Sequence, residues 1–188
     1  MPSQQQTSKT PIAIRDSWQT PQWLFDWADC RFNLDFDLAA SKDNAKCDRY
    51  FDVDSNSLEQ DWREGISFGW CNPPYSETGK WVEKACQESK KGARVALLIP
   101  AFNGESCWKY IYHHAPLVIS IIGRISFVTS TDFVQKGSNE KHYKAGDEVS
   151  GNTRGSCLVV FHRRFEGQTI TEAVDRDTIK KGFDNSDD

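Results

Sequence analysis

The chain has 188 residues, a length that predicts one domain with a buried core. Its formal net charge of −4 argues against a protein that coats nucleic acid non-specifically, because such proteins are basic. The polar first ten residues lack the apolar core of a signal peptide, and the apolar runs are too short to cross a membrane. The six cysteines are at least 15 residues apart, which excludes a Cys-x-x-Cys pair. We therefore expect a cytoplasmic protein with free thiols, no membrane segment and no metal ion.

The first half of the chain alternates predicted helices and strands. A flexible arm over residues 1–15 precedes a helix that we expect to begin with Thr20 as N-cap and Pro21 as its first residue. Alternating apolar and polar residues predict a strand over 32–38. The apolar run at 66–71 predicts the next strand, which leads directly into the sequence N-P-P-Y.

The second half of the chain continues this alternation. A helix is predicted over 80–91, because Gly92 supplies a C-cap. The continuous apolar run at 94–99 is typical of a strand that is covered on both faces. Residues 130–155 are polar and contain glycine, which predicts a long loop. The other predicted elements are a helix at 105–114 and strands at 117–122, 125–129 and 157–162.

Strands that alternate with helices predict an α/β fold with a largely parallel sheet. We expect a single domain over residues 16–165, followed by a partly disordered C-terminal extension over 166–188. In such sheets, ligands bind at the carboxyl ends of the strands. Asp37, with the small residues that follow it, and the N-P-P-Y turn both lie at predicted carboxyl ends, so we expect them to share a site.

The N-P-P-Y turn at residues 72–75 combines a rigid backbone, two hydrogen-bond acceptors and a ring. Prolines lock φ and donate no backbone hydrogen bond, so the Asn72 side-chain oxygen and the Pro73 carbonyl are held in one frame. Two acceptors beside the Tyr75 ring suit the exocyclic amine of a planar base, whose stacking on the ring is worth roughly 1–3 kcal/mol. The same acceptors would stabilise the positive charge that develops as the amine attacks an electrophile.

Several segments, in the same order, resemble the phage-type DNA adenine-N6 methyltransferase (Dam-like) family. They lie between residues 16 and 162 and read D-S-W-Q-T-P-Q-W-L-F-D (16–26), L-D-F-D-L-A-A-S-K-D-N-A-K-C-D-R-Y-F (34–51), S-L-E-Q-D-W (57–62), W-C-N-P-P-Y-S (70–76), V-A-L-L-I-P-A (95–101), I-G-R-I-S-F (122–127) and G-S-C-L-V-V-F (155–161). The resemblance implies a Rossmann-like class I methyltransferase fold, with a mixed, mostly parallel sheet and helices on both faces.

The resemblance also implies an activity, which is the transfer of a methyl group from S-adenosylmethionine to N6 of adenine in double-stranded DNA. The target base would be flipped out of the duplex. By position in the motif, Asn72 and Pro73 would hold the amine and Tyr75 would stack on the flipped adenine. A phage or prophage origin is implied as well, and the oligomeric state stays open between a monomer and a dimer.

A cofactor pocket is implied for several matching positions. Asp37 would pair with the methionine ammonium group through a charge-assisted hydrogen bond. Asn56 would contact the cofactor adenine, and the ribose would be held by Asp54, with Asp52 and Asp61 as open alternatives. The sequence A-A-S stands where methyltransferases usually carry a glycine-rich loop. The remaining residues expected to line this pocket are Thr20, Pro21, Ala39, Ala40 and Ser41.

Substrate contacts are expected from residues around the turn and from the polar segments. Phe102 would form the second wall of the base pocket. Lys136 and Arg124 would contact phosphates or base edges, and a solvated surface role for them is an equal alternative. Pro74, within the turn, and Ser76, which follows it, complete the predicted substrate set.

Two other functions remain compatible with these residues. An N-P-P-Y pocket also fits the planar amines of RNA bases and of protein glutamine, so a methyltransferase acting on either is the alternative within enzymes. A non-catalytic DNA-binding relic of the fold is the alternative outside enzymes, and the intact turn and Asp37 argue against it.

Overall fold

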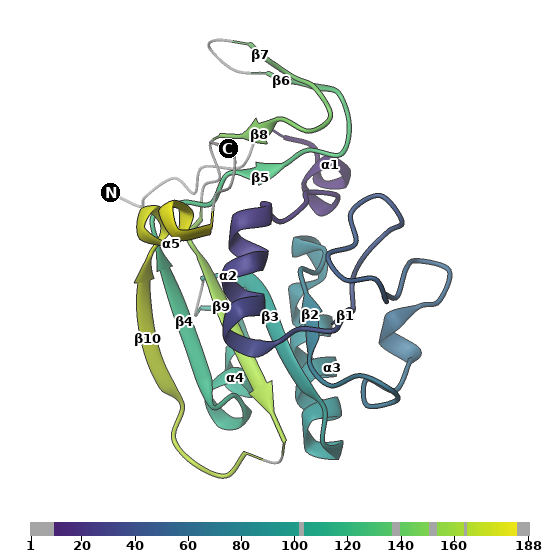
Figure 1. Ribbon diagram of the computed structural model, residues 1–188, viewed down its shortest axis with the longest axis vertical. Coiled ribbons are helices and arrows are strands. Elements are labelled where there is room, and N and C mark those ends of the chain that lie inside the picture. Colours follow the sequence, from purple (N-terminus) through teal and green to yellow (C-terminus); the bar gives the residue numbers. More distant parts are fainter. Residues whose placement is uncertain (1–9, 102–103, 137–139, 151–153, 164, 184–188) are drawn as a thin grey trace.

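The computed structural model of the protein describes residues 10–101, 104–136, 140–150, 154–163 and 165–183 (Figure 1). Six strands form one sheet, in which only β9 runs antiparallel to its neighbours. In spatial order they are β1 (Phe36–Asp37), β2 (Gly69–Cys71), β3 (Arg94–Pro100), β9 (Ser156–His162), β4 (Leu117–Ile122) and β10 (Ile170–Asp175). The predicted mixed, mostly parallel sheet is confirmed.

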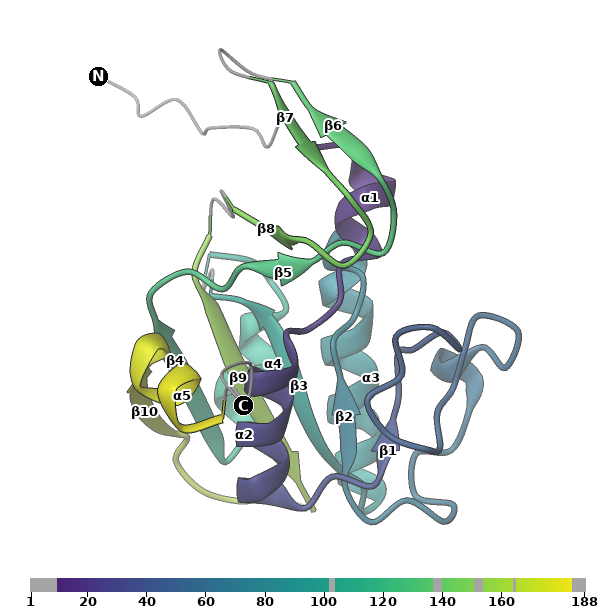
Figure 2. The ribbon, with the colours of Figure 1, turned by 45° about the horizontal axis from the view of Figure 1, so that its top comes forward.

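Helices cover both faces of this sheet (Figures 1 and 2). On one face, α2 (Gln22–Phe32) and α5 (Arg176–Phe183) pack against the strands in a core that includes Leu24 and Ile179. On the other face, α3 (Thr78–Lys91) and α4 (Trp108–His114) bury Trp81 and Ile111. The two cores meet only through the sheet, so the α/β architecture expected from the sequence is confirmed.

The strongest predicted elements agree with the structure. The apolar run predicted at 94–99 is β3, whose five central residues are buried on both faces of the sheet. The helix predicted to end before Gly92 is α3, and Gly92 adopts a positive φ of 121°, a conformation that glycine tolerates best. These elements form from local sequence and apolar burial together, which is why pattern alone identified them.

Two predicted elements near the amino end begin or end elsewhere. Pro21, not Thr20, is the N-cap of α2, and the Thr20 hydroxyl is buried without a hydrogen-bond partner. The strand predicted over 32–38 is reduced to β1, because α2 extends to Phe32 and Asn33 ends it in a left-handed conformation. Asp35 then bonds to Phe68 through its backbone, and its carboxylate accepts the backbone N–H groups of residues 67 and 68.

The loop predicted over residues 130–155 is wrong, because this region forms short antiparallel strand pairs. β5 (Phe127–Val128) pairs with β8 (Glu148–Val149), and β6 (Phe133–Gln135) pairs with β7 (Lys141–Tyr143). We call these two strand pairs the insert. Figure 2 shows the insert projecting above the sheet, beside α1 (Ile12–Asp16).

The two chain ends contribute ordered elements. Residues 170–183, which we assigned to a partly disordered extension, form β10 and α5. β10 pairs with β4 in parallel over its full length, from Ile170 opposite Leu117 to Asp175 opposite Ile122. All of α1 except Asp16 lies within the residues expected to form a flexible arm. Among the described helices, none combines the length and the apolar character that a membrane crossing requires.

Candidate active site

A cavity of about 620 Å³ lies at the carboxyl ends of β1 and β2. Because these strands are parallel neighbours, the residues that follow them meet at one edge of the sheet. Eight of the residues expected to contact cofactor or substrate line this cavity together: Thr20, Asp37, Ala39, Ala40, Ser41, Asn56, Asn72 and Pro74. The expected convergence of Asp37 with the N-P-P-Y turn is therefore present in the fold.

The close contact between β1 and β2 depends on one glycine. A Cβ atom added to Gly69 would lie 2.5 Å from Cδ1 of Leu38, whose side chain is fully buried. The backbone N–H of Leu38 donates to the Trp70 carbonyl at 2.8 Å. Gly69 thus allows the Leu38 side chain to lie flat on β2, which brings Asp37 and Asn72 to the same cavity.

Asp37 is a buried carboxylate held by the loop that follows it. One oxygen accepts the backbone N–H of Ala39 at 3.1 Å, and the other accepts that of Lys46 at 3.0 Å. Burial raises the Asp37 pKa to about 6, although these two hydrogen bonds and the Lys46 charge oppose the rise. The site therefore contains a partly desolvated anion, which a cationic ligand would stabilise.

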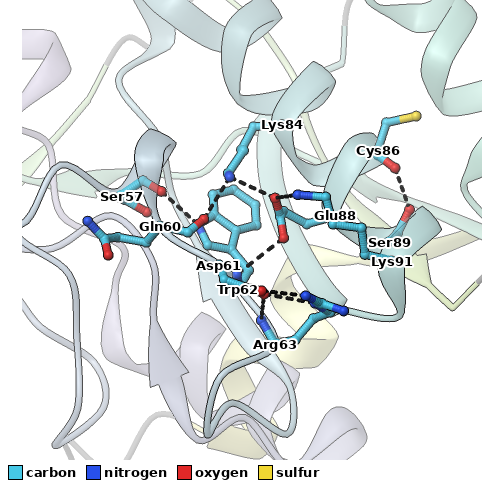
Figure 3. Close-up of polar contacts among 10 residues, drawn as sticks. All are labelled: Ser57, Gln60, Asp61, Trp62, Arg63, Lys84, Cys86, Glu88, Ser89 and Lys91. Carbon is cyan, nitrogen blue, oxygen red and sulfur yellow. Dashed lines mark hydrogen bonds and ion pairs between the residues drawn. The ribbon is translucent and has the colours of Figure 1, made fainter.

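The part of the cavity wall that contains Ser57 and Trp81 is supported by a polar network around a buried carboxylate, shown in Figure 3. The Glu88 carboxylate is almost fully buried and pairs with Lys84 at 2.7 Å and with Lys91 at 2.8 Å. It also accepts the backbone N–H of Trp62, whose indole N–H donates to the Ser57 carbonyl. This network fixes the segment that follows Asn56 against α3.

The cavity side of this wall contains polar groups without partners. Trp62 stacks on Trp81, with ring centroids 6.1 Å apart, and Trp81 lines the cavity. The Trp81 indole N–H and the Ser57 hydroxyl are buried, and neither makes a hydrogen bond. With the Thr20 hydroxyl, they give the cavity wall three buried groups that a polar ligand could satisfy.

Three acidic residues were candidates for binding a ribose, and the structure separates them. Asp52 lines the cavity, and hydrogen bonds from Ser55 hold its pKa below the ordinary value. Asp54 is exposed and lies outside the cavity lining. Asp61 pairs with Arg63, which lowers the Asp61 pKa, and it also lies outside the lining. Asp52 is the acid that is placed to meet a ligand there.

The side-chain amide of Asn72 is oriented by the chain segment that precedes α2. Its nitrogen donates to the main-chain carbonyl of Trp18 at 3.1 Å. Its oxygen is buried and has no partner. Since one end of the amide is fixed, the side chain has a set orientation, and its oxygen remains an unpaired acceptor in the wall between the cavity and the smaller space beside Tyr75.

Pro73 and Tyr75 lie on the other side of Asn72, around a space of only about 10 Å³. The Tyr75 ring meets Phe127 of β5 edge to face, at 5.7 Å between centroids, and Phe127 stacks on Trp18 at 6.0 Å. Arg15 also lines this space. Burial raises the Tyr75 pKa well above its ordinary value, so its hydroxyl stays neutral.

The remaining predicted residues lie outside the main cavity. Pro21 caps α2, and Ser76 is bonded to Asp16. Arg124, in the turn after β4, and Lys136, at the end of β6, are both exposed. Phe102 lies outside the described residues. Among the described residues, no three His, Cys, Asp or Glu side chains are arranged to hold a metal ion.

Sequence reasoning missed several residues that shape the site. Asp16 and Trp18 stand out in the sequence only as part of the matching segment 16–26. Lys46 lines the cavity beside Asp37, and its ammonium group donates to Gln22 at 3.0 Å. Trp81 carried no signal beyond helical periodicity, because its partner Trp62 is distant in sequence.

The chain is similar to known proteins over most of its length. A family model described as DNA N-6-adenine-methyltransferase (Dam) matches residues 7–184. A DNA N-6-adenine-methyltransferase of Escherichia phage T1 is 27% identical over 168 residues, which cover 86% of this chain and 68% of the relative. The protein of the same name from Haemophilus phage HP1 is 27% identical over 158 residues, 82% of this chain and 83% of the relative. Putative methyltransferase YfdM of Escherichia coli K12 is 38% identical over 69 residues, 33% of this chain and 74% of the relative.

Proposed function

The chain belongs to the DNA N-6-adenine-methyltransferase family, and from this premise we propose that its cavity binds S-adenosylmethionine and that Asn72 presents the amine of a flipped adenine to it. The buried, unpaired Asn72 oxygen carries this proposal. Membership of this family favours DNA as the substrate over RNA and protein glutamine. The two phage relatives support a phage-type enzyme.

The residues around the cavity fit the proposed cofactor. Its volume of about 620 Å³ is within the range of about 300–1,000 Å³ that is usual for small-molecule sites. The Asp37 carboxylate would bind the ammonium group, Asp52 the ribose, and the free Thr20 and Ser57 hydroxyls other polar atoms. Asn56 and Ala39–Ser41 would complete the lining. When bound, this cofactor supplies an electrophilic methyl group.

Asn72 and Pro73 would act on the adenine amine. The Asn72 oxygen and the Pro73 carbonyl would each accept one amine hydrogen, and this leaves the nitrogen lone pair directed at the methyl group. Acceptors fixed in advance stabilise the positive charge that develops on the nitrogen. The surplus proton is released once the nitrogen is alkylated, so the proposal requires no strong base.

The base side would have to open before an adenine could enter. A space of about 10 Å³ beside Tyr75 holds no base, and α1, Trp18 and Phe127 fill the surroundings. We infer that DNA binding displaces these groups and that Tyr75 then stacks on the flipped base. Lys136 and Arg124 are exposed, which supports a role in phosphate contact, and Pro74 and Ser76 would complete the substrate contacts.

The direct test is to incubate the protein with methyl-labelled S-adenosylmethionine and unmodified duplex DNA, and to hydrolyse the DNA to nucleosides. We expect the label in N6-methyladenine. Label in another base, or transfer only to RNA or protein in a competition among the three polymers, would contradict the proposal.

A further inference from the structure

Both ends of the N-P-P-Y turn are bonded to one short segment, residues 16–18. At the first residue of the turn, the Asn72 side-chain nitrogen donates to the Trp18 carbonyl. After the turn, the Asp16 carboxylate accepts the Ser76 backbone N–H at 3.1 Å and the Ser76 hydroxyl at 2.5 Å. Prolines between these points donate no backbone hydrogen bond, so these contacts hold the turn where its own backbone cannot.

The same segment is also attached to the insert. Gln19 and Val128 of β5 exchange two backbone hydrogen bonds, at 2.8 and 3.0 Å. The hydroxyls of Ser17 and Ser130 lie 3.1 Å apart. Residues 16–19 therefore lie between the catalytic turn on one side and the insert on the other, with hydrogen bonds to both.

From this arrangement we propose that Asp16 is a positioning residue for Asn72. By fixing Ser76 to the start of the segment, Asp16 sets the distance between the turn and the Trp18 carbonyl, which orients the Asn72 amide. The unpaired Asn72 oxygen is then held in one orientation before any substrate arrives. This inference rests on the proposed role of Asn72 as the acceptor for the adenine amine.

Two substitutions of Asp16 distinguish a positioning role from an effect of its negative charge. Asp16→Ala removes both bonds to Ser76, and we expect kcat to fall about 10- to 100-fold, because a misplacement of about 1 Å can cost this much. Asp16→Asn can still accept the Ser76 N–H through its oxygen and donate to the Ser76 hydroxyl through its nitrogen, so we expect it to retain most of kcat. In both variants the cofactor Kd and the DNA KM should stay within about threefold of wild type.

Asp35→Ala is the matched control, since Asp35 accepts two backbone N–H groups at the other end of β2. It should lower stability as much as Asp16→Ala while kcat stays unchanged. Unchanged kcat in Asp16→Ala, or equal losses in Asp16→Asn and Asp16→Ala, would overturn the proposal.

A second readout does not depend on methyl transfer. The Asn72 side-chain amide protons, identified by their absence in the spectrum of Asn72→Ala, should exchange slowly with solvent in wild type and Asp16→Asn. They should exchange fast in Asp16→Ala. Equal exchange rates in all three proteins would contradict positioning by Asp16. Loss of protection in Asp16→Ala alone would support it, even if the wild-type protein methylated no DNA and the proposed function failed.

Discussion

The spaces on the two sides of Asn72 differ in volume and in how they are enclosed. On the Asp37 side there is an open cavity of about 620 Å³, whose wall contains buried polar groups that make no hydrogen bond. On the Tyr75 side there is a space of about 10 Å³, closed by aromatic rings. Under the proposed function, the Asp37 side already has room for a cofactor, whereas the Tyr75 side has to rearrange before it can hold a base.

The difference follows from where each side gets its contacts. Among the described residues, the Asp37 carboxylate accepts hydrogen bonds only from backbone N–H groups two and nine positions away, so its side-chain contacts are local. The Tyr75 side is built from Trp18 and from Phe127 of the insert, which are both more than fifty residues away from Tyr75 in the sequence. Because Trp18 also lines the larger cavity, displacing its segment would open the Tyr75 side and change one wall of the Asp37 side.

The largest expected effect comes from Asn72→Ala, which removes the acceptor that the two sides share. We expect kcat to fall about 100- to 1,000-fold, as for the loss of one preorganised group, with cofactor Kd nearly unchanged. Asn44→Ala is the contrasting variant, because the Asn44 oxygen accepts the Ser41 N–H in the cavity wall. It should raise cofactor Kd and leave kcat at saturation close to wild type. If both variants changed kcat and cofactor Kd in the same way, the proposed difference between the two sides of Asn72 would be wrong.

Asp37→Asn should affect only the cofactor side. Loss of the charge should raise cofactor Kd about 10- to 100-fold, the equivalent of about 1.5–3 kcal/mol for a hydrogen bond to a charged group. Because burial raises the Asp37 pKa to about 6, the wild-type Kd should increase as the pH falls below 6, by up to about tenfold per unit. Calorimetric titrations between pH 5 and 7.5 measure this, and a pH-independent Kd in wild type would count against Asp37 as the ammonium partner.

Gly69→Ala tests the close contact between β1 and β2, which brings Asp37 and Asn72 to the same cavity. The added Cβ would overlap Leu38, so we expect a loss of about 1–3 kcal/mol in the free energy of unfolding. Gly79→Ala is the control, since nothing lies within 4 Å of its added Cβ and alanine favours the helix by up to about 1 kcal/mol. Urea titrations compare the two, and an undisturbed Gly69→Ala protein would show that the β1–β2 contact is less tight than described.

Lys136→Glu should give the smallest effect, and only on the DNA side. If Lys136 contacts one phosphate, DNA Kd rises a few-fold and the slope of log Kd against log salt decreases by about one. Lys109→Glu on α4 changes the same charge and should alter neither value. Identical salt slopes for Lys136→Glu and wild type would assign Lys136 to a solvated surface.

The sequence predicted the elements whose formation depends on burial and local capping. The apolar runs of β3 and β9 and the glycine that ends α3 are visible in the residues themselves. A strand was predicted at 125–129, where β5 lies, but β6, β7, β8 and β10 escaped prediction because they are short or largely exposed and form only by pairing with other strands. Only the fold supplies such partners.

The candidate site also has parts that the sequence predicts and parts that only the fold determines. Asp37 and Asn72 could be predicted to share a site, because residues after parallel neighbouring strands meet at one edge of the sheet. The bond from Asn72 to the Trp18 carbonyl could not, since a backbone acceptor carries no signal in the residue type. The choice of Asp52 over Asp54 likewise depends on which side of one turn faces the cavity.

The most direct test of the difference between the two sides is a calorimetric titration of S-adenosylmethionine into the protein without DNA. We predict saturable binding at one site, with the same affinity in Asn72→Ala and a weaker affinity in Asp37→Asn. Binding that appears only after DNA is added would contradict a cofactor side that is complete before the substrate arrives.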